Sequence, residues 1–324
     1  MSSKTLSVVV PVYNIADHVD HLANELSKLS DIDAQVIVVD DGSSDGTPDK
    51  VREIAHGVDD FTLIENPKNS GAGVARNTGF PLATGKYTLF FDGDDYLHSD
   101  DILETINKLD RTGADASINR YDFIRDGQRT ETGMNVIDRV LWRNFYQKLQ
   151  TGSFRLLDAP RFLEFTNYPW NKIIRTDHYQ GLGIDPLFGE TRVNNDILGH
   201  WNILLEARQL VLVDKTIVTH HISGARDHLS NRFGRERLDL FVALRSVLVR
   251  IRRDGEMKDT YGPVFWSFAH RLMVWAEGRI DESVAPAYRM RRRALVSEIS
   301  FEELLGVKRF DNGKVYRWLM DRIG

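Results

Sequence analysis

The chain reads Leu89-Phe90-Phe91-Asp92-Gly93-Asp94-Asp95-Tyr96-Leu97 at the stretch that decides its fold. Three apolar residues predict the end of a buried strand, and three carboxylates follow within four positions. Carboxylates crowded this closely repel one another, so burying them together is costly unless a cation lies between them. Oxygen ligands from a short acidic loop suit a hard divalent ion such as Mg²⁺ or Mn²⁺, which shares its coordination sphere with substrate phosphates. The alternative is an ordinary solvated acidic turn.

Strand-like and helix-like runs alternate on both sides of this stretch. Strands are expected at 6–14, 35–39, 61–64, 87–91 and 114–121, and the continuous apolar run within the first of them suits a parallel strand covered on both faces. Helical spacing of apolar residues occupies 15–29, 47–55, 72–82 and 99–109. Asn14 is placed to cap the first helix, and Thr47 followed by Pro48 starts the second. This alternation predicts a doubly wound α/β layer sandwich.

Polar clusters follow three of these strands, at 13–14, 40–46 and 92–95. Ligands bind such sheets at the carboxyl ends of the strands, so we expect the site where these clusters meet. In Asp40-Asp41-Gly42-Ser43 a carboxylate at the end of a strand can accept a hydrogen bond from a uracil-type imide N–H, a donor that cytosine lacks. The same residues are also common turn chemistry.

A glycine-rich run at 71–79 invites comparison with dinucleotide-binding motifs, because it contains Gly71, Gly73 and Gly79. That fingerprint should follow the first strand directly, whereas this run follows a polar loop in the third unit. We therefore interpret it as a helix N-terminus with close backbone approach, and with Arg76 one turn in, an arrangement that favours a diphosphate.

The pattern loosens after Tyr121. Residues 122–138 predict polar loops or an edge hairpin, and helical spacing recurs near 140–150, 158–166 and 191–207. Short strands are expected at 210–213 and 216–221, and from Gly234 onward almost everything is helical. The tail is therefore expected to form a helical subdomain.

Composition is that of an ordinary globular protein, with 42% hydrophobic and 27% charged residues, and without cysteine no thiolate metal site is possible. We find neither a signal-peptide layout nor an apolar run of the roughly 18–20 residues that a membrane span needs, and expect a cytoplasmic protein.

The net charge of −5 argues against general nucleic-acid binding. Residues 234–293 carry 13 Lys and Arg against 8 Asp and Glu. This basic part could contact an anionic membrane face or polymer, or be a solvated helical surface.

The motifs together resemble the family-2 inverting glycosyltransferases of GT-A fold. The resemblance covers roughly residues 5–115 and is carried, in order, by 9–14, 39–47, 69–71, 75–79 and 91–95. It implies a mostly parallel sheet flanked by helices, a nucleotide-sugar donor that is usually a UDP-sugar, and Mn²⁺ or Mg²⁺. The expected division is a glycosyltransferase domain over 1–230, with donor binding in 1–120 and acceptor binding in 121–230, followed by a helical subdomain over 231–324.

The resemblance also implies roles for individual residues. The base would be held by Pro11, Tyr13 and Asp41, and the ribose and phosphates by Asn69, Gly71, Arg76, Asp92 and Gly93. Asp94 would hold the metal, and Asp95 would face the acceptor.

The second half matches the family less well. Family members usually carry a Glu-Asp pair that opens a helix, and its Asp is the general base; here the pair is Asn195-Asp196. Asp196 is thus the expected base, with Asn195 in place of Glu. Glu190 is the competing candidate, and a plain helix-cap role is the alternative for Asp196.

The resemblance also implies that two further segments contribute to the site, one to acceptor binding and one near the metal. Trp170 and Asn171 resemble residues that line the acceptor site, although Trp170 could simply be a core residue. His220 and His221 follow a strand where the family places a residue near the metal and diphosphate. Adjacent strand residues face opposite sides, so only one can serve, and we favour His220.

These features predict an inverting, metal-dependent transferase that moves a hexosyl or N-acetylhexosaminyl group to a hydroxyl of a glycan, glycolipid or polyol-phosphate polymer in cell-surface polysaccharide synthesis. Through Arg250, Arg252, Arg253 and the run 291–293 the tail could reach a lipid-linked acceptor at the inner membrane face, or mediate homo-oligomer formation. The competing hypotheses are a non-catalytic nucleotide- or carbohydrate-binding homologue and a nucleotidyltransferase. A nucleotidyltransferase requires a glycine-rich basic loop after the first strand, and residues 11–15 contain neither glycine nor basic residues.

Overall fold

The structure, a computed structural model, describes residues 4–125, 128–129, 133–222, 234–310 and 313–323. The described strands are β1 (Leu6–Val12), β2 (Ala34–Asp40), β3 (Phe61–Glu65), β4 (Tyr87–Phe90), β5 (Tyr96–Leu97), β6 (Ala116–Arg125), β7 (Gln128–Arg129), β8 (Ile173–Arg175) and β9 (Leu210–Ile222). The N-terminal helices are α1 (Val19–Ser27), α2 (Thr47–Ile54), α3 (Ala72–Gly79) and α4 (Ser99–Thr112). They are followed by α5 (Val136–Leu149), α6 (Thr176–Gly181), α7 (Asn195–Glu206), α8 (Asp239–Arg252), α9 (Gly255–Glu277), α10 (Ala285–Val296), α11 (Phe301–Phe310) and α12 (Lys314–Ile323).

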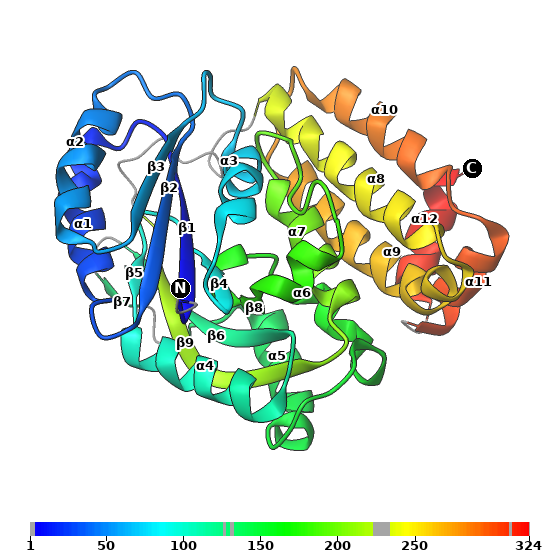
Figure 1. Cartoon of the computed structure of the whole chain (residues 1–324). Helices are drawn as coiled ribbons and strands as arrows, with labels where there is room; N and C mark the ends of the chain where they lie inside the picture. Colours follow the sequence, from blue (N-terminus) through cyan, green and yellow to red (C-terminus); the bar gives the residue numbers. More distant parts are fainter. Residues whose placement is uncertain (1–3, 126–127, 130–132, 223–233, 311–312, 324) are drawn as a thin grey trace.

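The described strands form one mixed sheet in the order β3-β2-β1-β4-β8-β6-β9-β5, with β7 paired to β6. Its first four strands are parallel, because β1 pairs with both β2 and β4, and β2 with β3. As expected for parallel strands covered on both faces, β1 and β2 are almost wholly buried. In Figure 1, α1 and α2 lie on one side of these strands and α3 on the other. The predicted α/β fold is confirmed.

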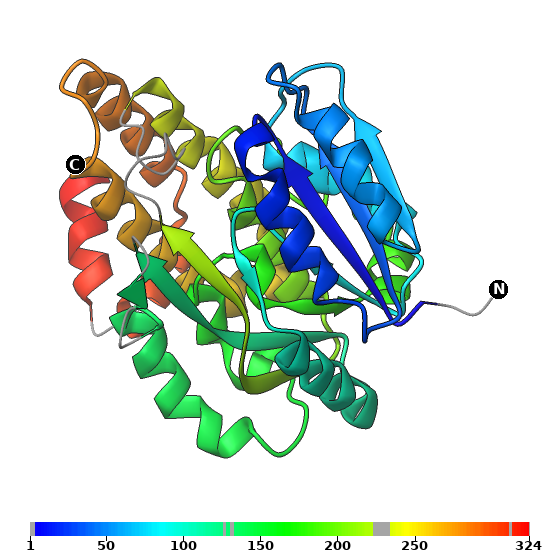
Figure 2. The same cartoon turned by 90° about the vertical axis from the view of Figure 1, so that its left-hand side faces the viewer.

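The second half of the sheet is built by β6 and β9, a long parallel pair that runs beside the short antiparallel strands β5 and β8. Figure 2 shows these two strands extending together past the first half of the sheet. We predicted two short strands in place of β9. The chain instead continues as a single strand, whose pairing with β6 shifts register near Arg120.

Three smaller expectations are corrected by the structure. Asn14 does not cap α1; it has a positive φ of 50°, and its side-chain oxygen accepts from the Ser44 N–H at 2.9 Å. The helix expected near 158–166 is a short 3₁₀ helix at Pro160–Glu164. The helix expected at 191–207 begins only at Asn195, because the preceding residue has a left-handed φ of 61°.

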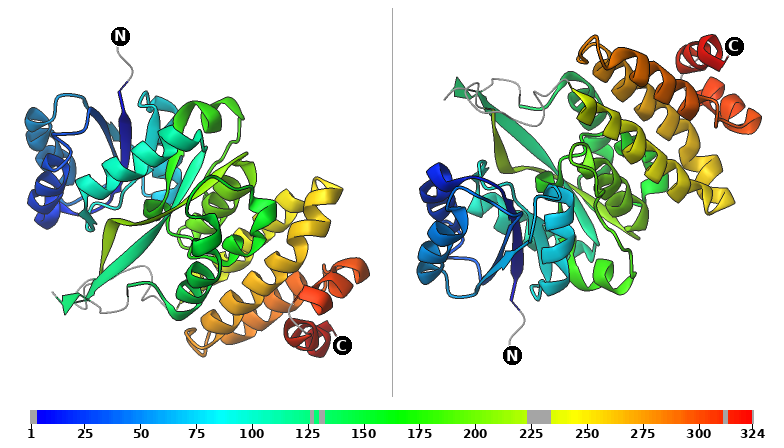
Figure 3. Two further views of the ribbon diagram at one scale, coloured as in Figure 1. Left: turned by 90° about the horizontal axis from the view of Figure 1, so that it is seen from below. Right: turned by 90° about the horizontal axis from the view of Figure 1, so that it is seen from above.

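The C-terminal helices gather on the side of the molecule away from α1 and α2, as both views in Figure 3 show. They share the core of the sheet domain: Trp201 on α7 contacts Phe265 and Phe268 on α9, with ring centroids 5.8 and 5.7 Å apart. Glu164 accepts from Ser267 on α9 at 2.7 Å. In the described part of the chain, no helix combines the length and apolar character that crossing a membrane requires.

Candidate active site

Two carboxylates at the end of β2 have different partners. Asp41 accepts from the backbone N–H groups of Ser70 and Gly71 at 2.9 and 2.6 Å, and from Asn66 at 3.0 Å. It therefore orders the loop that carries the predicted donor residues Asn69 and Gly71. One oxygen of Asp40 accepts from Gly42 and Ser43, but its other oxygen is buried without a hydrogen-bond partner among the described residues. Asp40 is 1% exposed, so this unpartnered oxygen lies beneath the surface of the site and not on it.

The loops after β1 and β2 are tied together beside these carboxylates. The Asn14 N–H donates to Ser43 at 2.8 Å, and the Ala16 N–H donates to Asp45 at 3.0 Å. Tyr13, which is 45% exposed, lies on the first of these loops. Pro11 lies two residues earlier, within β1, and is half-buried. The predicted base-binding residues thus lie at an edge of the sheet where two loops are joined by hydrogen bonds, and the ring of Tyr13 is exposed to solvent.

Arg76 connects the donor side of the site to α7. Its side chain is buried, one end of the guanidinium pairs with Asp92 at 2.5 Å, and the other donates to the side-chain oxygen of Asn195 at 3.0 Å. The guanidinium also lies over the ring of Phe188, 5.5 Å from its centroid. Its Nε has no partner among the described residues. The structure thus joins three residues that lie 16 and 119 positions apart in the sequence.

A close contact between α3 and α7 makes this connection possible. A Cβ on Gly73 would lie 2.0 Å from the carbonyl oxygen of Gly189 and 2.7 Å from the Cβ of Asn195. The Gly189 N–H in turn donates to the Asn195 carbonyl at 2.8 Å. Gly73 therefore lets the start of α7 approach Arg76.

The acidic turn after β4 is anchored to β9 through Asp95. This side chain is fully buried, and one of its oxygens accepts from the His221 N–H at 2.9 Å and lies 2.7 Å from Nδ1 of His220. Its other oxygen has no partner among the described residues. Burial raises the pKa of Asp95. Burial alone would lower the pKa of His220, but the Asp95 carboxylate outweighs it and raises that pKa to about 9.

The residues of this turn fit a divalent cation that is shared with a substrate. Among the described residues, no group of three or more His, Asp and Glu side chains could enclose a metal ion. The half-buried carboxylates of Asp92 and Asp94 provide the hard oxygen donors that Mg²⁺ and Mn²⁺ prefer. Such an ion would complete its coordination with donor phosphates and water.

Asp196, the predicted base, is the second residue of α7 and is half-buried. Asn167 donates a side-chain hydrogen bond to one of its carboxylate oxygens. Burial raises the pKa of Asp196 to about 6, although the positive charge of Arg76 opposes that shift. The N-cap position of α7 belongs to Asn194 rather than to Asp196. The competing candidate Glu190 has an exposed side chain.

An aromatic stack begins at Tyr168, the residue after the Asn167 that donates to Asp196. Tyr168 stacks on Trp170 with ring centroids 4.6 Å apart, and Trp170 stacks on His220 at 5.6 Å. His221 faces away, toward the ring of Tyr96. Trp170 and Asn171, predicted to contact the acceptor, are 1% and 0% exposed. They form the buried layer behind Tyr168 and Asn167, which are half-buried and which the sequence analysis missed.

Residues 7–182 match the family model for glycosyl transferase family 2. The chain belongs to this family. Glycosyltransferase GlyA of Streptococcus pneumoniae is 23% identical over 230 residues, which are 67% of this chain and 30% of the relative. Poly(ribitol-phosphate) beta-glucosyltransferase of Bacillus spizizenii is 32% identical over 120 residues, which are 36% of this chain and 19% of the relative. This family-2 chain thus spans less than a third of the length of either relative.

Two solved structures share the fold of this family-2 chain. S. aureus TarS 1-349 in complex with UDP-GlcNAc matches with a TM-score of 0.73 and 20% identity, covering 98% of this chain and 90% of that chain. The mannosyltransferase PcManGT from Pyrobaculum calidifontis, in complex with GDP-Man and Mn²⁺, matches with a TM-score of 0.55 and 18% identity, covering 99% and 85%.

Proposed function

We propose that this chain is an inverting, metal-dependent glycosyltransferase that uses a UDP-sugar, with Asp196 as the general base. One observation carries the proposal: a continuous chain of hydrogen bonds runs from Asp92 through Arg76 to Asn195, the neighbour of Asp196. It joins the acidic turn predicted to hold the donor to a carboxylate whose pKa of about 6 suits proton abstraction near neutral pH.

Donor binding is assigned to the edge formed by β1 and β2. Pro11, Tyr13 and Asp41 are assigned to the base, on which the exposed ring of Tyr13 can stack. Asn69 and Gly71 are assigned to the ribose and phosphates, on the loop that Asp41 orders. The likeness to TarS, whose complex contains UDP-GlcNAc, supports a UDP-sugar.

The leaving diphosphate is assigned to the acidic turn and its neighbours. Asp94, helped by Asp92, would hold a divalent ion, which when bound supplies charge neutralisation of the leaving group. Arg76 adds positive charge on the protein side. His220, whose Nδ1 lies 2.7 Å from the Asp95 carboxylate, is assigned to the metal and diphosphate side of the site.

The acceptor side is assigned to the surface around Asp196. The carboxylate takes the proton of an acceptor hydroxyl as that oxygen attacks the anomeric carbon opposite the leaving group, which inverts the configuration. Asn167 holds the carboxylate in place, and Tyr168 offers a half-buried ring to a sugar. The names of the relatives support a polyol-phosphate polymer or another cell-surface glycan as acceptor and a hexosyl or N-acetylhexosaminyl group as the sugar.

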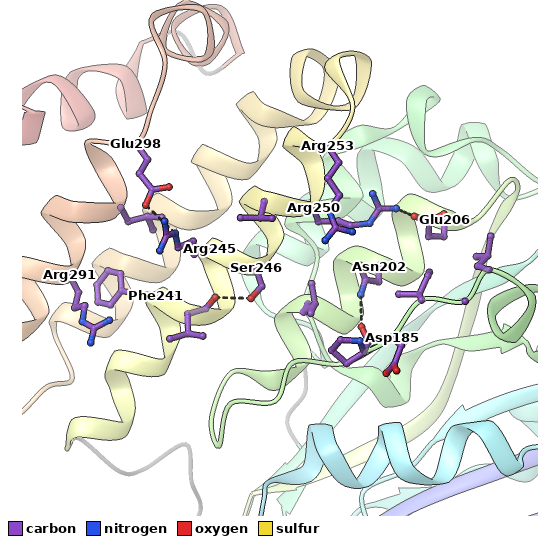
Figure 4. A pocket seen from close by; sticks show the side chains of 18 of the residues that line it. Asp185, Asn202, Glu206, Phe241, Arg245, Ser246, Arg250, Arg253, Arg291 and Glu298 are labelled. Carbon is purple, nitrogen blue, oxygen red and sulfur yellow. Dashed lines mark hydrogen bonds and ion pairs between the residues drawn. The ribbon is translucent and has the colours of Figure 1, made fainter.

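The basic tail is proposed to bind an anionic acceptor polymer. Four of its described arginines are engaged in ion pairs: Arg245 with Glu298, Arg250 with Glu206, Arg252 with Glu303 and Arg292 with Glu277. Arg253 and Arg291 are exposed and help line a pocket of about 860 Å³ between α7, α8 and α10 (Figure 4). Charge reversal at both should weaken binding to a phosphate polymer. Loss of anionic-vesicle sedimentation instead would indicate a membrane contact.

The proposed activity is tested with a panel of UDP-, GDP-, CDP- and dTDP-sugars in the presence of Mn²⁺ or EDTA. We expect metal-dependent turnover of one UDP-sugar, loss of that turnover in Asp94→Ala, and a product whose anomeric proton coupling in NMR shows inversion. Retention of configuration would overturn the inverting mechanism. If none of the nucleotide sugars binds, the chain is a non-catalytic homologue.

A further inference from the structure

The segment Thr166–Lys172 supplies the acceptor side of the site with its side chains. It joins the 3₁₀ helix Pro160–Glu164 to β8, and its own regular structure is the single 3₁₀ turn Pro169–Asn171. Asn167 donates to the carboxylate of Asp196, and Tyr168 and Trp170 form the stack that ends on His220. Whatever fixes the backbone of this segment therefore also fixes the position of the proposed base.

A buried ammonium group lies at the end of this segment. Lys172 is 1% exposed, and its Nζ donates to the carbonyl of Tyr168 at 2.8 Å, the carbonyl of Thr166 at 3.4 Å and Oδ1 of Asn171 at 2.6 Å. Every one of these acceptors belongs to the segment itself. Within the described residues no carboxylate lies within ion-pair distance of Nζ, so the ammonium is not part of a salt bridge.

A buried carboxylate holds the same segment from the opposite side. Asp138, 1% exposed, accepts from the Thr166 N–H at 3.2 Å, from the Tyr121 hydroxyl at 2.5 Å and from Asn135 at 2.9 Å. The Thr166 peptide region is thus held through its N–H by a buried anion and through its carbonyl by a buried cation. Asn167 follows directly.

Fold stability gives little reason for this arrangement. Burying an ammonium without a counter-ion is costly, and an apolar side chain of similar length usually serves a core at least as well. The cost shows in Lys172 itself, whose pKa burial lowers to about 7 although Asp138 and Asp196 oppose that shift. What the ammonium does provide is a fixed geometry for two backbone carbonyls beside the base.

We propose that Lys172 is a positioning residue for the proposed glycosyl transfer: its buried ammonium fixes the backbone of Thr166–Asn171 so that Asn167 holds the Asp196 carboxylate ready for the acceptor. This inference rests on the proposed function, because the base it positions is the one assigned there. The charge has a second effect in the same direction, since it also favours the ionised form of Asp196.

The test compares Lys172→Met, which is one atom shorter than Lys and removes its charge and donors, with Lys148→Met on the exposed face of α5. We expect Lys172→Met to bind UDP within about twofold of wild type, but to lower kcat at least about tenfold with little change in the donor KM, since misplaced catalytic groups cost rate. The acid limb of its kcat profile should move to higher pH, because the lost cation no longer favours the Asp196 carboxylate. Lys148→Met should match wild type in each measurement.

The amide hydrogen exchange of residues 166–172 gives a readout independent of turnover, and it should become faster in Lys172→Met. If kcat and the acid limb stay at wild-type values, Lys172 is only structural and the proposal is overturned. If Lys172→Met does not fold, Lys172→Gln, which removes the charge but keeps a donor, decides: a limb at higher pH than in wild type supports the proposal, and an unchanged profile overturns it. If wild type turns over no donor at all, the proposed function fails, while the exchange rates still report whether Lys172 orders the segment.

Discussion

The Arg76 guanidinium donates a hydrogen bond of 3.0 Å to the side chain of Asn195, the residue immediately before Asp196. At this position the sequence departs from the Glu that the family resemblance leads one to expect. The amide oxygen satisfies a buried cation without placing a second negative charge beside the proposed base. The departure is therefore compatible with the chemistry.

This relationship predicts the effect of Asn195→Asp, which keeps the size of the side chain and adds a negative charge. A like charge next to Asp196 disfavours its ionised form, so the acid limb of the kcat profile should move to higher pH. The pH dependence of kcat at saturating donor measures this directly. A limb that stays in place would show that position 195 does not influence the base, and a limb that moves to lower pH would contradict the expected repulsion.

The wild-type enzyme should itself lose activity as the pH falls through about 6. Burial raises the pKa of Asp196 to about 6, and only the ionised carboxylate can accept a proton, so kcat should rise with pH across that value. Activity that is flat between pH 5 and 7 would be inconsistent with Asp196 as the base.

Asp41→Ala should act on stability first. Its carboxylate accepts three hydrogen bonds from the 66–71 loop, and leaving buried donors without partners costs about 1–3 kcal/mol each. Urea unfolding should show a loss of about 2 kcal/mol or more. Unfolding at the wild-type midpoint, combined with lost UDP binding, would instead make Asp41 a direct ligand contact.

Gly73→Ala should separate the helices that bring Arg76 to Asn195. The new methyl group would overlap the Gly189 carbonyl, and overpacking of this kind costs about 1–3 kcal/mol. We expect lower stability together with reduced kcat, because the start of α7 must move. Gly57→Ala is the matched control, since a Cβ there meets no atom within 4 Å. Equal behaviour of the two variants would refute the close-packing argument.

The first half of the fold could be predicted because its signals are local. Buried parallel strands such as β1 and β2 read as continuous apolar runs, and their carboxyl ends meet at one edge, so the motifs around Asp41 and Asp94 fall together. Arg76 was predicted from the glycine-rich start of a helix, whereas Asp196 was named only through the family resemblance. The short strands β5 and β8 carry too few residues to give a periodic signal.

The second half of the site depends on contacts that no local pattern encodes. Asn167 donates to Asp196, 29 positions away in the sequence. Lys172 donates to the backbone of its own loop, although a lysine without a partner in the sequence pattern would be expected to lie in solvent. The roles of Asp40 and Asp41 differ only because one side chain turns toward the 66–71 loop. Such choices are made by tertiary packing.

The central claim is that Asp196 removes the acceptor proton, and Asp196→Asn tests it most directly, with Asp20→Asn on the exposed surface of α1 as the control. Asn keeps the shape of the side chain and cannot act as a base. The account predicts UDP affinity within about twofold of wild type, and kcat lowered by about 10²–10⁴ in Asp196→Asn only. A transfer rate within a few-fold of wild type would contradict it.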